Sequence, residues 1–137
     1  MNPIESYPEN LPLLIQKEIR DRLMADPYFA EHRVSMLLQD EGEIATLIDQ
    51  QTLPITGPLL VIAVGAIDAN SPGVSVAIEL LITEHPVTNR ARAGFDTALG
   101  VAWHAATLLN GDTFLFERIT HLLNEDGTFQ AVVSLRY

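Results

Sequence analysis

The sequence predicts an α+β fold with a mixed, mainly antiparallel sheet of about four to five strands and two main helices packed on one face. Two stretches alternate between apolar and polar residues, as strands with one buried face do, at 74–82 and at 129–137. Two other stretches carry apolar residues at helical spacing, at 11–24 and at 95–109. Strand-like and helical runs that share one short chain must cover one another, which favours a single sheet with helices on it.

The composition predicts one globular domain. The chain has 137 residues, of which 47% are apolar, and it contains no repeat, linker or low-complexity tract. Such a chain is long enough to bury a core, so we expect a single domain over 1–137 with a loose N-terminal arm at 1–9. The net charge of −10 repels phosphate backbones, and we expect no nucleic acid binding. The acidic surplus serves either solubility or the pairing of acidic faces with basic ones in an assembly.

The chain has no cysteine, which excludes disulfides and thiolate metal sites. Its first residues lack the basic and apolar regions of a secretory signal. The longest apolar run, 59–64, extends weakly to 67 and is far too short to span a bilayer. We therefore expect a protein that does not enter the membrane and that works in, or assembles from, the cytosol.

The first helix is predicted to begin after Asn10, a suitable N-cap, with Pro12 in its first turn. It runs for about four turns along an apolar stripe. The stripe contains Leu11, Leu14, Ile15, Ile19 and Leu23. Asp26-Pro27 ends or bends this helix, because proline disfavours a helical residue before it. A short strand is expected at 34–38, and 43–50 forms either a short helix or part of a longer loop.

The central hairpin is predicted from two strands around a turn-rich loop at 68–73. The first strand, 59–67, is almost continuously apolar, as in a central strand covered on both faces. The second strand has one apolar face and one mainly polar face, to which Leu81 is the exception. Its apolar face consists of Val74, Val76, Ile78, Leu80 and Ile82.

The C-terminal third is predicted to contain a helix and a second hairpin. The helix begins near Phe95 and ends before Gly111 at the C′ position. Its small and apolar positions are Ala98, Leu99, Ala102, Ala105, Ala106 and Leu109. A strand follows at 113–123, then Asp126-Gly127, a strong hairpin signal, and the alternating strand 129–137.

Catalytic and metal-binding motifs are absent from the sequence. The histidines His32, His85, His104 and His121 lack the spacing of a metal site. Glu84 and His85 are either an acid–base pair or polar residues of a corner, and His104 beside Trp103 is expected to be partly packed. The serines near the central hairpin, Ser71 and Ser75, do not lie in a nucleophile elbow. The sequence therefore offers no motif that predicts an enzyme or a metal site.

A compact cluster of charged and amide side chains follows the second strand: Glu84, Asn89, Arg90 and Arg92. One interpretation is a solvated corner in which Asn89 or Thr88 caps a helical turn. The other is a subunit interface, since the planar guanidinium of arginine binds carboxylates in two places at once. The acidic candidates for such a contact are Asp40, Glu41 and Glu43.

The residues Ile82-Thr83-Glu84-His85-Pro86-Val87-Thr88-Asn89-Arg90 resemble the Glu-x-Pro-x-x-Asn-Arg corner of small tail proteins of long-tailed bacteriophages and prophages. In that family, too, the corner follows an apolar strand and precedes an amphipathic helix that ends in Leu-x-Gly, here Leu109-Asn110-Gly111. The resemblance covers roughly residues 11–135, and its sharp motif is the corner. The family is that of the tail-terminator or tail-completion proteins, a group of minor tail proteins.

The resemblance implies a non-enzymatic, cofactor-free α+β protein that forms a homo-oligomeric ring, commonly a hexamer. Such a ring caps the tail tube, ends its polymerisation and offers a surface for head attachment. The implied partners are further copies of the chain, the tail tube and head-connector proteins, and the implied location is the virion tail, with the bacterial cytoplasm during assembly. The residues carried over are Glu84, Pro86, Asn89 and Arg90, and Arg92 joins them as an interface candidate.

The segment 39–51 has no counterpart in the family and leaves tail-length control, capsid joining and a general tail role open. The alternative class is a small-molecule-binding or regulatory α+β oligomer, which requires a closed apolar pocket between helix and sheet. An assembly protein requires complementary charged edges and no deep pocket.

Overall fold

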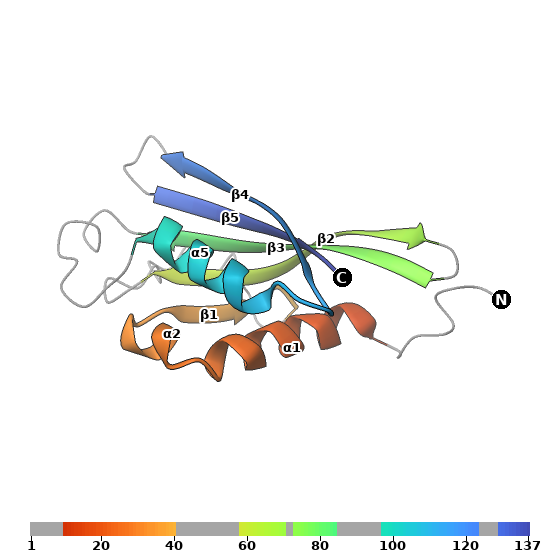
Figure 1. The fold of residues 1–137 in the computed structure, drawn as a ribbon, viewed down its shortest axis with the longest axis horizontal. Helices are drawn as coiled ribbons and strands as arrows, with labels where there is room; N and C mark the ends of the chain where they lie inside the picture. Colours follow the sequence, from red (N-terminus) through yellow and green to blue (C-terminus); the bar gives the residue numbers. More distant parts are fainter. Residues whose placement is uncertain (1–9, 41–57, 71–72, 85–96, 124–128) are drawn as a thin grey trace.

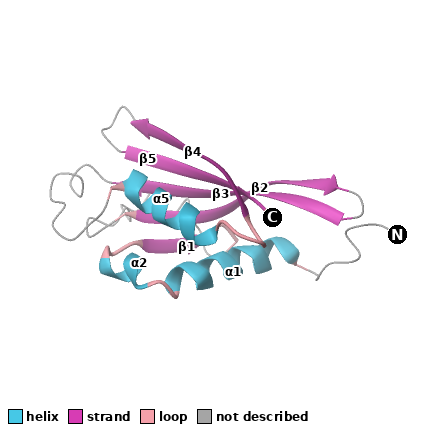
Figure 2. Ribbon diagram, in the orientation of Figure 1, coloured by secondary structure: helices cyan, strands magenta, loops and turns pink. Residues whose placement is uncertain are grey.

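The computed structural model describes residues 10–40, 58–70, 73–84, 97–123 and 129–137 and places helices on one face of a five-stranded sheet (Figures 1 and 2). The elements are α1 (Leu11–Met24), α2 (Pro27–Glu31), β1 (Ser35–Leu38), β2 (Leu59–Asn70), β3 (Gly73–Glu84), α5 (Ala98–Leu109), β4 (Leu115–Leu123) and β5 (Phe129–Arg136). The predicted α+β class is confirmed, and the sheet is mixed.

The strands lie in the order β1-β2-β3-β5-β4. β1 pairs with β2 in parallel, whereas the pairs β2–β3, β3–β5 and β4–β5 are antiparallel. It follows that β1 and β4, the two outermost of these strands, run in opposite directions. α5 lies in the connection between the parallel strands β3 and β4, and it packs on β5, β3 and β4.

The core lies between the helices and one face of the sheet. The predicted face of β3 is fully buried from Val76 to Ile82 and partly buried at Val74. Leu80 is fully inaccessible, as are its cross-strand neighbours Ile62 and Val133. Leu81 points to the other face, where it lies in register with Val61 and Val132. The apolar exception in the strand pattern therefore belongs to an apolar row that crosses the second face of the sheet.

β2 differs from the prediction that both of its faces are covered. Leu60 and Ile62 are fully buried, whereas Val61 and Ala63, which alternate with them, stay partly exposed, so the burial alternates over 60–63. The hairpin pairing with β3 extends to Asn70 and Gly73, further than the predicted turn at 68–73 allows. The paired ends of β2 and β3 project beyond the rest of the sheet (Figure 1).

The N-terminal helix begins and ends as predicted. The side chain of Asn10 accepts a hydrogen bond from the backbone N–H of Leu13 at 3.3 Å, and the helix ends just before Asp26. The sequence analysis missed α2, for which Asp26 serves as N-cap and Pro27 as the first residue. Arg33, with φ 55°, then turns the chain into β1. The possible helix at 43–50 lies outside the described residues.

The predicted second helix begins slightly later than expected, at Ala98. Gly111 follows the C-cap Asn110 as predicted but has no left-handed φ, and its N–H donates to the carbonyl of Phe114 at 2.9 Å. The helix therefore ends in a turn leading into β4 and not in the left-handed glycine motif. The second hairpin is confirmed by the antiparallel pairing of β4 with β5.

Candidate interaction site around helix α5

The glutamate of the corner motif joins β3 to the beginning of α5. Glu84 is the last residue of β3, is 1% exposed, and accepts a hydrogen bond through Oε2 from the backbone N–H of Ala98 at 3.0 Å. The N-cap Thr97 accepts from Gly100 N–H at 2.9 Å. Two of the backbone donors that a helix leaves unsatisfied at its N-terminus are thus paired, one of them by a carboxylate at the positive end of the helix dipole.

The other predicted interface residues, Pro86, Asn89, Arg90 and Arg92, lie outside the described residues, as do His85, Glu41 and Glu43. The interface role of the corner therefore stays a prediction. Asp40 is described, and its Oδ2 accepts from Gln16 Nε2 at 2.9 Å while its N–H donates to Gln16 Oε1 at 3.2 Å. This two-point contact fixes the end of β1 to α1, where the Gln16 side chain is fully buried.

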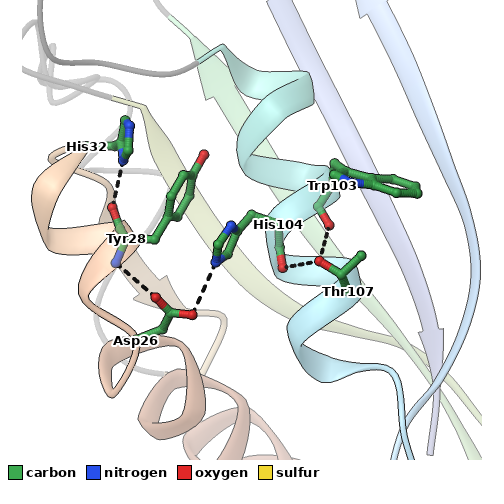
Figure 3. A network of polar contacts seen from close by, with 6 residues as sticks. All are labelled: Asp26, Tyr28, His32, Trp103, His104 and Thr107. Carbon is green, nitrogen blue, oxygen red and sulfur yellow. Dashed lines mark hydrogen bonds and ion pairs between the residues drawn. The ribbon is translucent and has the colours of Figure 1, made fainter.

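A second polar contact, which the sequence analysis did not predict, holds α5 to the start of α2 (Figure 3). Asp26 Oδ1 accepts from the N–H of Tyr28 at 2.9 Å, and Oδ2 lies 3.1 Å from His104 Nε2. The rings of Tyr28 and His104 are stacked, with centroids 3.8 Å apart and planes inclined by 3°. One carboxylate therefore caps a helix and orients an imidazole from another helix.

This arrangement lowers the pKa of Asp26. The largest cause is the hydrogen bond from the Tyr28 N–H, followed by the one to His104, because both stabilise the ionised carboxylate. The histidine was expected to be partly packed, and its side chain is 37% exposed. Its partner lies 78 residues away in the sequence, so no local pattern pointed to the pair.

We expect Asp26→Asn to reduce stability at neutral pH more than in acid. A carboxylate whose pKa is lower in the folded state stabilises the protein above its unfolded pKa of about 4, and this contribution is lost as the pH falls through the folded value. Thermal unfolding of wild type and variant from pH 7 to pH 2.5 measures the effect. The difference in Tm between them should shrink towards acid, and a difference that is independent of pH would contradict this role of Asp26. Asp21→Asn, an exposed residue of α1, is the control.

The two flanks of α5 differ in character. His104 faces Asp26 and Tyr28, whereas Trp103 points away from them, toward the side of β5 and β4 (Figure 3). Trp103 is 60% exposed, and Leu99, one turn earlier, is 42% exposed. Tryptophan is among the residues most enriched at the energetic centres of protein interfaces, so this flank of α5 is a candidate contact surface.

An open hollow of about 510 Å³ lies at the opposite edge of the molecule. Its lining comes from α1, α2, β1 and the turn before β1: Arg20, Asp21, Met24, Phe29, Ala30, Val34 and Met36. Met24 is 66% exposed, so the hollow opens to solvent. Within the described residues, no three histidine, cysteine or acidic side chains gather as a metal site would require. None of the described helices is long and apolar enough to cross a bilayer.

No protein-family model matches the chain, and no curated protein matches it significantly. The candidate site thus rests on two features of the structure: Glu84, which anchors the beginning of α5, and exposed Trp103 on the outer flank of the same helix.

Proposed function

We propose that the chain is a non-enzymatic structural protein of a phage or prophage tail, whose copies form a ring that caps the tail tube and ends its polymerisation. The observation that carries the proposal is the place of the corner motif. Its glutamate, Glu84, ends β3 and accepts a hydrogen bond from the backbone N–H of Ala98, the first residue of α5, so this residue of the motif ties the strand to the helix. The α+β class is also the one that the resemblance to tail-terminator proteins implies.

The surface of the described residues supports an assembly role over the alternative of a small-molecule-binding oligomer. That alternative requires a closed apolar pocket between helix and sheet. The hollow beside β1 instead opens to solvent, and two of its lining residues, Arg20 and Asp21, are charged. Exposed Trp103 and Leu99 form a surface suited to a protein partner.

Deletion of the gene from the phage or prophage that encodes the chain tests the proposal. Without a terminator the tube should continue to polymerise, so electron microscopy of lysates should show tails of uncontrolled length and heads without tails. A plasmid copy of the wild-type gene should restore tails of uniform length. Tails of normal length, joined to heads, in the deletion strain would contradict the proposal.

A further inference from the structure

The two outermost strands of the described sheet offer complementary edges. β1 and β4 run in opposite directions, and each is paired along one side only with another described strand. If copies follow one another by rotation about an axis roughly along the strands, β4 of one copy meets β1 of the next in antiparallel orientation. Antiparallel pairing is the arrangement that two adjacent sheet edges most readily form. Sheet polarity therefore favours a head-to-tail contact between copies.

The same head-to-tail arrangement would place exposed Trp103 of one copy next to the hollow beside β1 of the next copy. Trp103 points toward the side of β5 and β4 (Figure 3), and Phe116 and Ile119 of β4 point to the same helix-bearing face, in register with the buried Leu135 and Val133. At the other edge, Met36 faces the same layer, because its partner in β2 is the buried Leu60. Helix α5, which carries Trp103 and packs on β5, β3 and β4, and the hollow beside β1 therefore lie on the same face of the sheet, toward its opposite edges.

The chemistry of the hollow suits an indole. Met24 and Met36 supply flexible, polarisable thioethers that adapt to an aromatic ring, and Phe29 supplies an apolar wall. Arg20 also lines the hollow, and although it pairs with Asp21 at 3.7 Å, its positive charge complements the negative face of an indole ring. A contact that uses different patches on its two sides is heterologous and produces a ring when the rotation closes.

We propose that Trp103 of one copy seats in the hollow formed by Met24, Phe29 and Met36 of the next copy, alongside antiparallel pairing of β4 with β1. This proposal rests on the ring of the proposed function and assigns its subunit contact. The occupant of the hollow is a second copy of the chain, because one sequence supplies the exposed tryptophan, a hollow lined by two methionines and a phenylalanine, and two sheet edges of matching polarity.

The first part of the test uses the fluorescence of Trp103, which is the only tryptophan of the chain. As protein concentration rises, the emission maximum should shift to the blue in step with the molar mass from light scattering. Trp103→Ala and Met24→Glu should each weaken association by at least about 30-fold, as expected for an interface hot spot. Both sites are exposed, so the variants should keep the wild-type Tm. Ile67→Glu, at a residue that is 48% exposed on the projecting hairpin, is the matched control and should assemble as wild type does.

The second part distinguishes this contact from any symmetric one. The Trp103→Ala variant has an intact hollow but no tryptophan, and the Met24→Glu variant has the tryptophan but an altered hollow. In an equimolar mixture, Trp103 of the second variant can enter the hollow of the first, and no further contact can extend the pair. The mixture should form a 1:1 heterodimer and nothing larger, although neither variant associates alone. If both variants still formed rings as the wild type does, this contact would be overturned and the proposed function would be unaffected. A wild type that stays monomeric, or a mixture without the heterodimer, would also overturn it, whereas failure of the tail function would appear independently in the gene deletion.

Discussion

Replacing Leu80 with alanine should lower the free energy of unfolding by about 2–5 kcal/mol, the range measured for leucine truncations in close-packed cores. Leu80 is fully buried in the middle of β3, between Ile62 on one neighbouring strand and Val133 on the other. The surrounding strands are held by backbone pairing and cannot collapse freely into the space, so most of the cavity should remain. A small domain is stable by only about 5–15 kcal/mol, so this variant should be severely weakened.

Urea unfolding followed by circular dichroism measures this loss, and Leu81→Ala is the control. Leu81 is the next residue of the same strand but lies on the opposite, partly exposed face. Its truncation should cost only about 1 kcal/mol, because less apolar surface returns to water. Equal losses for the two variants would contradict the placement of the core on the helix side of β3.

Glu84→Ala should lower the free energy of unfolding by about 1–3 kcal/mol, since it leaves a buried backbone donor without its acceptor. The donor is the N–H of Ala98, a residue with no exposed surface, and the carboxylate also lies at the positive end of the α5 dipole. Glu84→Gln keeps an acceptor oxygen and should recover part of the loss.

The matched control for this prediction is Glu79→Ala, which removes an exposed glutamate from the same strand and should change stability by less than about 0.5 kcal/mol. Chemical unfolding of all three variants gives the comparison. If Glu84→Ala were as stable as Glu79→Ala, the corner glutamate would have no anchoring role, and the main support for the proposed function would be lost.

The strands and the two main helices could be predicted from the sequence, because burial on one face leaves a periodic apolar pattern. Leu81 looked like a break in that pattern when β3 was considered alone. Leu81 is apolar because it lies between Val61 and Val132 on the second face of the sheet. These neighbours come from other strands, and no local sequence pattern encodes the register between strands. The short helix α2 was missed because Pro27 was interpreted as the end of α1, although proline is equally suited to the first turn of a new helix.

The candidate site was less predictable than the fold. The sequence marked Glu84 as part of a polar corner, but its hydrogen-bond partner is the backbone N–H of Ala98, which lies 14 residues later in the chain. The Asp26–His104 contact joins segments 78 residues apart and has no local signal. Trp103 lies within a helix rich in small apolar residues, and only the packing of α5 decides that this side chain faces outward.

Molar mass in solution, measured by light scattering across protein concentration, tests the head-to-tail ring most directly. We expect a discrete species that dissociates on dilution, because a heterologous contact repeats until the ring closes, and the resemblance to tail-terminator proteins implies about six subunits. A molar mass that stays at one or two subunits over the whole concentration range would contradict the head-to-tail ring. A symmetric dimer uses the same patch on both copies, so no further copy can be added.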